Sequence, residues 1–117
     1  MKNLMSTYKT YDIVVVPFPF TDVLNSKNRP AIILSSQFFN NAGYCILAMI
    51  TSAHHNAWPL DIKIQDLKAC GLEKASLIRF KLFTLDNRLI KAKIGILSKK
   101  DQKIFNESIS KVFQDLL

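Results

Sequence analysis

Sequence motifs that mark the common enzyme classes are scarce or missing in this chain of 117 residues. It holds only three glycines, at positions 43, 71 and 95, which are too scattered to form a glycine-rich phosphate-binding loop. No Gly-x-Ser-x-Gly elbow is present, and the acidic residues are scattered rather than paired. The sequence therefore argues against P-loop nucleotide chemistry and against serine hydrolase chemistry.

Cysteine and histidine are also rare. Cys45 lies in an apolar run and Cys70 precedes a glycine, and neither has a spacing typical of metal or redox sites. We expect two inert thiols in a reducing cytoplasm. His54 and His55 are adjacent, and neighbouring strand residues point to opposite faces, so they are poorly placed to share a metal. A solvated loop is the default interpretation of this pair and a direct catalytic role is the alternative. We expect no metal and no cofactor.

Long hydrophobic runs are missing too. The longest uninterrupted one covers residues 44–50, far below the ~20 residues that a membrane-spanning helix needs. The N-terminus is polar through Tyr11 and lacks the pattern of a signal peptide. These features predict a soluble, cytoplasmic protein that does not bind a membrane.

The composition is that of a globular protein, with 49% hydrophobic and 21% charged residues. The length predicts a single domain over residues 1–117. Sixteen Lys and Arg against nine Asp and Glu give a net charge of +7, which favours polyanionic partners, nucleic acid first. An acidic protein partner would fit the same charge.

Short β-branched and apolar segments dominate the chain and predict a mainly β (α+β) fold. We expect strands at 12–16, 31–34, 44–50, 60–64, 75–80, 82–85 and 89–97, with Pro17 and Pro19 ending the first. Ser98 begins the one long helix, in a sequence that resembles a capping box. The helix carries an apolar stripe expected to pack on the core: Ile104, Phe105, Ile109, Val112, Phe113 and Leu116. The natural architecture is a small, strongly curved barrel with this C-terminal helix packed on it.

A basic residue stands where a polar loop meets a buried strand. Arg29 precedes Pro30, and a residue before proline is steered into an extended conformation. If the strand at 31–34 pairs antiparallel with the strand at 44–50, Arg29 and Thr51 meet at one rim of the barrel. A guanidinium suits a phosphate, and a threonine hydroxyl can donate to a second phosphate oxygen. The pair indicates an anion site, whereas a simple solvated loop end remains the alternative for Arg29.

Five short motifs, in order, link the chain to a known family: Asp12-Ile13-Val14, Pro17-Phe18-Pro19-Phe20-Thr21-Asp22, Arg29-Pro30-Ala31, Ile50-Thr51-Ser52, and Ser76-x-x-Arg79 followed by 81–86. From about Tyr11 to near Lys111 the chain resembles the MazF/PemK toxins of bacterial toxin–antitoxin pairs. The resemblance implies an SH3-like barrel, a homodimer and sequence-selective, metal-free cleavage of single-stranded RNA. It also implies a cognate antitoxin with a disordered acidic tail, DNA binding together with that antitoxin, and catalytic roles for Arg29 and Thr51.

Two positions depart from the family pattern. Most members begin the first strand with Gly-Asp, whereas here Tyr11 precedes Asp12, which we interpret as a change in strand entry only. Many PemK-like members carry an acidic residue soon after the arginine that matches Arg79. Here Phe80 and Lys81 follow, so a mechanism with that carboxylate as base does not transfer.

The mechanism that the resemblance favours is in-line attack of a ribose 2′-hydroxyl on the adjacent phosphate. Arg29 is a poor base because an arginine stays protonated, so its role is to neutralise the phosphorane charge. Thr51 would hold a phosphate oxygen, and the base stays unassigned. Further residues expected to bind the RNA are Phe18, Phe20, Asn25, Lys27, Asn28, Ser52, Trp58, Arg79 and Lys81, although core packing is equally compatible with the aromatic ones.

Two alternatives to a nuclease remain at this point. Toxins that poison DNA gyrase share this barrel and act by docking a protein, although retention of Arg29 and Thr51 argues against that reading. A basic barrel that binds RNA without cutting it is the other.

Overall fold

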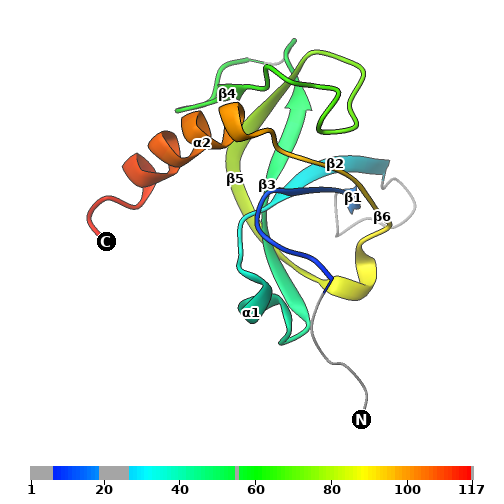
Figure 1. Cartoon of the computed structure of the whole chain (residues 1–117). Coiled ribbons are helices and arrows are strands. Elements are labelled where there is room, and N and C mark those ends of the chain that lie inside the picture. The colour runs from blue at the N-terminus through cyan, green and yellow to red at the C-terminus, as the bar shows by residue number, and fades with distance from the viewer. Residues whose placement is uncertain (1–6, 19–26, 55, 117) are drawn as a thin grey trace.

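The computed structural model describes residues 7–18, 27–54 and 56–116. Its six strands form one antiparallel sheet in the order β4-β5-β3-β2-β1-β6, which curls into a half-barrel (Figure 1). The strands are β1 (Asp12–Phe18), β2 (Lys27–Ile33), β3 (Tyr44–Ser52), β4 (Ile62–Lys63), β5 (Ser76–Asp86) and β6 (Ala92–Ile96). The helices are α1 (Gln37–Asn40), the 3-10 turn η2 (Asn87–Leu89) and α2 (Lys99–Val112). The predicted mainly β barrel with a C-terminal helix is confirmed.

The first two strands extend further than the sequence indicated. β1 continues through Pro17, which pairs with Asn28 of β2, so the prediction that the prolines end the strand at residue 16 was wrong. β6 pairs with β1 only as far as Val15, so Pro17 has no partner on β6. The N–H that proline lacks therefore costs no hydrogen bond between these two strands. β2 likewise begins at residue 27 rather than 31, which places Arg29 inside the strand, opposite Val16.

The segments predicted as strands 75–80 and 82–85 are one strand, β5. The register with its partner β3 shifts at one point: Ala48 of β3 pairs with Leu82, whereas the next residue, Met49, pairs with Arg79. The residues between them, Phe80 and Lys81, have no partner on β3. This two-residue bulge explains why the sequence pattern broke at this point.

Two other predicted strands are shorter in the structure. Residues 60–64 were expected to form a strand, but Leu60 has a positive φ of 62° and β4 begins only at residue 62. The segment 89–97 was expected to be one strand, but its first residue closes the turn η2. That turn is fixed because the Asp86 side chain accepts from the Arg88 N–H, and β6 therefore begins at residue 92.

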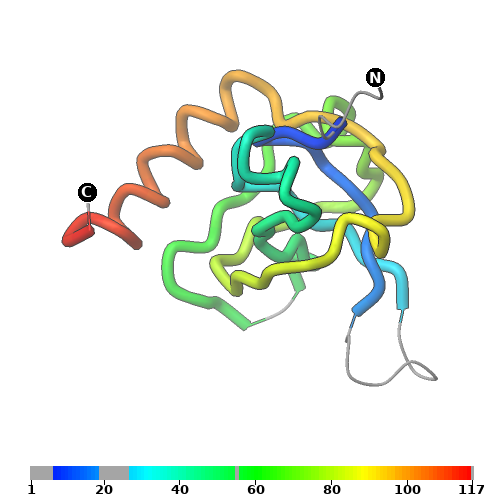
Figure 2. Tube along the Cα trace, turned by 90° about the horizontal axis from the view of Figure 1, so that it is seen from below, coloured from blue at the N-terminus to red at the C-terminus, as the bar shows by residue number. Residues whose placement is uncertain are grey.

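Alternate residues of the central strands supply two apolar clusters, as the period of a strand requires. Ile32 belongs to one cluster, whereas its neighbours Ala31 and Ile33 belong to the other. The first cluster includes Ile13, Ile50 and Ile78 from the sheet and Phe105 from α2. The second holds Val14, Val16, Leu47 and Leu85. Figure 2 shows the chain wrapped around this interior, with α2 at one side.

The residues 64–72 that follow β4, here called the closing segment, approach β6 and so join the two ends of the sheet. The Ile96 N–H donates to the Ala69 carbonyl at 3.0 Å. Gly71 has a φ of +73°, and a Cβ there would overlap the Ile94 carbonyl. A Cβ on Gly95 would in turn collide with the backbone of residues 69 and 70. The two glycines allow a backbone contact that a side chain would prevent.

The start of α2 is fixed by Ser98, whose hydroxyl accepts from the Asp101 N–H, as the capping pattern predicted. The Asp101 side chain is fully buried and accepts from the N–H groups of Gln65 and Asp66. α2 is thereby attached to the segment that closes the sheet.

Only part of the apolar stripe on α2 packs on the core. Ile104, Phe105 and Ile109 contact the first cluster. Val112 and Leu116 are 38% and 78% exposed, so the prediction that the whole stripe is buried was wrong. Figure 1 shows the reason, because the C-terminal part of the helix leads away from the sheet. None of the helices in the described part of the chain is long and apolar enough to span a membrane.

Candidate functional site

Arg29 and Thr51 line the same cavity. β2 and β3 are antiparallel, and their register pairs Ala31 with Met49. Continuing that register by two residues places Arg29 opposite Thr51. The cavity has a volume of about 510 Å³ and lies between these strand ends and the loop before β5. Its lining residues are Asn28, Arg29, Pro30, Ile50, Thr51, Ser52, Gly71, Leu72, Glu73, Lys74, Ala75 and Ser76.

Arg29 has a fixed backbone, but one donor of its guanidinium, the Nε, lacks an acceptor among the described residues. The residue is half-buried, its backbone pairs with Val16 of β1, and Pro30 follows it. Its Nε is buried and has no hydrogen-bond partner among the described residues. An unsatisfied buried donor costs roughly 1–3 kcal/mol, more when it is charged. An anion bound beside this guanidinium would offset part of that cost through its charge.

Thr51 and Ser52 are the last two residues of β3, where the strand meets the start of β5. Thr51 pairs with Leu77 and Ser52 with Ser76, and both β3 residues are half-buried. The Ser52 hydroxyl accepts from the His54 N–H at 3.3 Å, which holds the chain as it leaves the strand. Two hydroxyl groups are therefore positioned at the rim of the cavity.

The cavity is also lined by two charged residues that no sequence motif indicated, Glu73 and Lys74. Both are exposed and lie on the loop between the closing segment and β5. No motif marked this loop, because its position depends on a contact between residues far apart in the chain.

Trp58, Arg79 and Lys81, predicted to bind RNA, form one cluster. The guanidinium carbon of Arg79 and the Nζ of Lys81 lie 5.7 and 5.8 Å from the centroid of the Trp58 ring. Asp61 accepts from Arg79 Nε at 3.2 Å and from its Nη2 at 2.9 Å. The hydrogen bond to Asp61 raises the pKa of Arg79 further above its usual value. The Asn56 carbonyl accepts from the same Nη2 at 2.6 Å.

These contacts fix the loop that carries Trp58. The Trp58 N–H donates to the Asp61 carboxylate at 2.9 Å, and the Asp61 N–H donates back to the Trp58 carbonyl at 3.1 Å. Trp58 itself remains 41% exposed. Arg79 lies two residues along β5 from Leu77, the partner of Thr51, so strand alternation puts it on the same face of the sheet.

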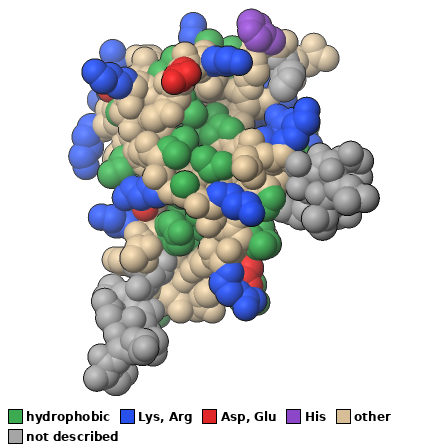
Figure 3. All heavy atoms as spheres, turned by 90° about the vertical axis from the view of Figure 1, so that its right-hand side faces the viewer, with side chains coloured by type: hydrophobic (Ala, Val, Ile, Leu, Met, Phe, Trp, Pro, Cys, Tyr) green, Lys and Arg blue, Asp and Glu red, His purple; other side chains and the backbone are tan. Residues whose placement is uncertain are grey.

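The other predicted residues that the structure describes lie where β1 ends and β2 begins. Phe18 is half-buried and pairs with Lys27, which is exposed, and Asn28 lines the cavity. Phe20 and Asn25 lie outside the described residues. On the face in Figure 3, Lys and Arg side chains are spread around a central group of apolar ones.

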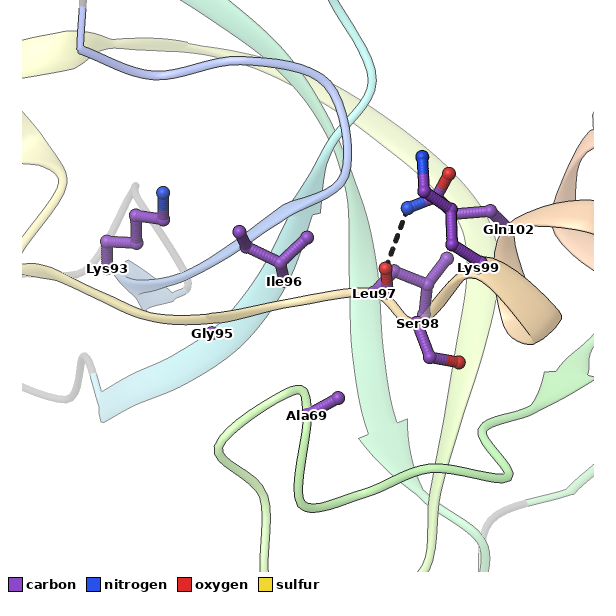
Figure 4. A pocket seen from close by; sticks show the side chains of 8 residues that line it. All are labelled: Ala69, Lys93, Gly95, Ile96, Leu97, Ser98, Lys99 and Gln102. Carbon is purple, nitrogen blue, oxygen red and sulfur yellow. Dashed lines mark hydrogen bonds between the residues drawn. The ribbon is translucent and has the colours of Figure 1, made fainter.

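A second cavity, of about 580 Å³, lies where the closing segment meets β6 and α2 (Figure 4). It is lined by Ala69, Lys93, Gly95, Ile96, Leu97, Ser98, Lys99 and Gln102. Gln102 donates to the Leu97 carbonyl at 2.8 Å, and Lys93 is paired with the buried Asp12 at 3.1 Å. Its lining holds no carboxylate, imidazole or thiol, so the Arg29 cavity is better equipped for chemistry. Within the described residues, no group of three or more His, Cys, Asp or Glu could hold a metal ion.

Comparison with protein families matches residues 9–113 to the PemK-like, MazF-like toxins of type II toxin–antitoxin systems. The chain belongs to this family. A comparison with curated protein sequences finds no match.

Solved structures of such toxins share the fold. The Mycobacterium tuberculosis toxin MazF-mt6 superposes with a TM-score of 0.70 at 18% identity, over 88% of this chain and 96% of that one. A Deinococcus radiodurans MazE-MazF structure gives 0.72 at 15% identity, over 93% and 98%. An endoribonuclease from Mycobacterial species in complex with its cognate antitoxin gives 0.70 at 11% identity, over 94% and 96%.

The structure explains one departure from the family pattern. Tyr11, where most members have glycine, has a φ of +79°, a conformation that glycine adopts without strain. Its ring meets Phe105 edge-on at 6.3 Å between centroids, and its hydroxyl donates to Asn106 at 2.7 Å. The change is more than an altered strand entry, because the larger side chain also contacts α2.

Proposed function

We propose that this toxin is an endoribonuclease that cleaves single-stranded RNA at selected sequences without a metal ion. The observation that carries the proposal is the cavity that both Thr51 and Arg29 line, with the Nε of Arg29 buried and without a partner among the described residues. A fixed cation beside a hydroxyl donor is suited to a phosphodiester and to the extra negative charge that develops on it during cleavage.

In the proposed reaction the RNA supplies its own nucleophile. The 2′-oxygen attacks the adjacent phosphorus, the bond to the 5′-oxygen breaks, and the products end in a 2′,3′-cyclic phosphate and a 5′-hydroxyl. Arg29 stabilises the charge on the phosphorane and Thr51 positions a phosphate oxygen. Loss of one such donor typically costs ~3 kcal/mol, or about two orders of magnitude in rate.

Sequence selectivity in this proposal comes from the residues around the cavity. Single-stranded RNA is read by stacking of unpaired bases on aromatic rings and by hydrogen bonds to their edges. Trp58 is partly exposed, fixed by its loop, and in contact with Arg79, which strand alternation places on the same face of the sheet as Thr51. Lys81 brings positive charge to it, whereas the charge of Arg79 is balanced by Asp61, and Lys27 adds another exposed cation near the hairpin end.

The partners proposed for the chain follow from its family and its charge. A net charge of +7 suits both RNA and the acidic tail of an antitoxin, and the two would compete for the same basic surface. A homodimer, DNA binding together with the antitoxin and a cytoplasmic location are part of the same proposal. Exposed apolar side chains such as Phe38, at 88%, and Leu116 are available to a second copy.

The test of the proposal is RNA cleavage by purified protein in EDTA. A long single-stranded RNA of mixed sequence is incubated with the wild type, with Arg29→Ala and with Thr51→Ala, and cleavage sites are mapped from the product ends. Arg88→Ala is the matched control, because its side chain is 89% exposed at a distant turn. We expect cuts at a few sequences, 5′-hydroxyl ends, a loss of at least about 100-fold for Arg29→Ala and full activity for the control.

Other outcomes would point to the alternatives. Intact RNA across varied sequences would refute the nuclease, and inhibition of DNA gyrase by the same sample would then support a protein-docking toxin. Tight binding of RNA without cleavage would support a non-cleaving barrel. Cleavage of a substrate with a 2′-deoxy sugar at the mapped site would refute attack by the 2′-hydroxyl.

A further inference from the structure

The cavity around Arg29 needs a group that accepts the proton of the 2′-hydroxyl. Arg29 and Lys74 are protonated at neutral pH, and hydroxyl groups such as that of Thr51 are too weakly basic. Among the described residues that line the cavity, Glu73 alone carries a carboxylate, and none carries an imidazole. Many relatives carry an acidic residue soon after the arginine that matches Arg79, whereas here Phe80 and Lys81 follow.

The loop that carries Glu73 is anchored at both ends. On its N-terminal side, the Leu72 N–H donates to the Leu67 carbonyl at 2.9 Å, and Gly71 is packed against the backbone of Ile94. On its C-terminal side, the Ser76 hydroxyl donates to the Lys74 carbonyl at 2.7 Å. A carboxylate held on a fixed loop loses little freedom when it meets a substrate.

The charged groups around Glu73 are cations. Glu73 is exposed, and the charged groups that line the cavity with it are the cations Arg29 and Lys74. The buried Ile50 and the half-buried Leu72 also line the cavity. A carboxylate in this place shares the cavity with the cation proposed to hold the phosphate.

We propose that Glu73 is the general base of the RNA cleavage, which rests on the nuclease function proposed above. The Glu73 carboxylate takes the proton of the 2′-hydroxyl while the 2′-oxygen forms its bond to phosphorus. The bond from phosphorus to the 5′-oxygen then breaks, the 5′-oxygen takes a proton from solvent, and Glu73 returns its own proton to solvent. Arg29 balances the charge on the phosphate throughout. The base thus comes from the loop before β5 and not from β5 itself, the strand that carries Arg79.

The experiment compares Glu73→Gln and Glu73→Asp with the wild type on a short RNA that spans a mapped cleavage site, in EDTA and as a function of pH. Glu107→Gln, an exposed glutamate on α2, is the matched control. Removing a general base typically costs about 100- to 10,000-fold in rate. We expect that loss in kcat for Glu73→Gln with KM nearly unchanged, partial recovery for Glu73→Asp, and no change for the control.

Two further readouts separate a base from a structural or binding residue. The rate for Glu73→Gln should rise tenfold per pH unit through the neutral range, because hydroxide replaces the missing base, while the wild type is flatter there. The affinity for the same RNA with a 2′-deoxy sugar at the cleavage site should be equal in the two proteins. Circular dichroism and the thermal midpoint confirm that both are folded.

Each result decides the assignment. Glu73→Gln with activity within about threefold of the wild type and an unchanged pH profile would overturn the role of Glu73 while leaving the nuclease function intact. A loss that appears only in KM and in the affinity for the deoxy substrate would make Glu73 a binding residue and would also overturn it. A wild type that cleaves no RNA would refute the nuclease function itself.

Discussion

The buried carboxylate of Asp101 is expected to stabilise the whole closed sheet, and Asp101→Ala tests this directly. Asp101 has no exposed surface and accepts from the N–H groups of Gln65 and Asp66 and from the Ser98 hydroxyl at 3.2 Å. It also lies in the first turn of α2, where a negative charge is favoured by the helix dipole.

The magnitude follows from what the substitution leaves behind. Two backbone N–H groups lose their acceptor, and each orphaned donor costs about 1–3 kcal/mol. Relief of the cost of burying a charge offsets part of this loss. We expect Asp101→Ala to lower the free energy of unfolding by about 2–5 kcal/mol, a large share of the ~5–15 kcal/mol typical of such domains. Asp101→Asn keeps one acceptor oxygen and should lose about half as much.

The assay is urea unfolding followed by circular dichroism, with Asp115→Ala as the control, since that aspartate is exposed beyond the end of α2. Hydrogen exchange adds a local readout, because the amides of Gln65 and Asp66 should lose protection first. A loss below about 0.5 kcal/mol for Asp101→Ala, or equal values for Ala and Asn, would refute the reasoning.

Three other predictions follow from local geometry. Tyr11→Gly should be more stable than Tyr11→Ala by about 1 kcal/mol in urea unfolding, because the φ of +79° strains any residue with a Cβ; the usual order, Ala above Gly, would contradict this. Burial raises the pKa of the Cys45 and Cys70 thiols to about 11, so iodoacetamide at pH 8 should label them only in urea, and rapid labelling of the folded protein would show that they are accessible. Hydrogen bonds from Arg88 lower the pKa of Asp86 to about 2, so its contribution to stability is present above its ordinary value of about 3.9 and is lost as the pH falls toward 2. Asp86→Asn should flatten that part of the acid unfolding curve, and an unchanged curve would argue against the pair.

Local patterns in the sequence predicted the strands and the juxtaposition of Arg29 with Thr51, because both depend on short-range rules. An apolar run and its antiparallel pairing with the next strand bring Arg29, in the first half of β2, near Thr51 at the end of β3. The same reasoning found Ser98 as the start of α2.

Local rules of this kind do not predict contacts between segments that lie far apart in the chain. Glu73 reaches the cavity only because the closing segment packs Gly71 against Ile94 of β6, and no local pattern encodes that approach. Trp58, Arg79 and Lys81 were chosen singly from the sequence, whereas their assembly depends on Asp61, which carried no signal of its own. The bounds of β1 and β5 were wrong for the same reason, because the pairing of Pro17 and the bulge in β5 are set by the partner strand.

The two-residue bulge at Phe80 and Lys81 has a consequence for how this chain can change in length. Because two residues are inserted, Leu77 and Arg79 before the bulge stay on the same face of the sheet as Leu85 after it. Deletion of one residue would turn one half of β5 over, burying Arg79 or exposing the core leucine. Loss of both residues, or gain of two more, would leave every face unchanged. Natural insertions and deletions at this point should therefore occur in pairs.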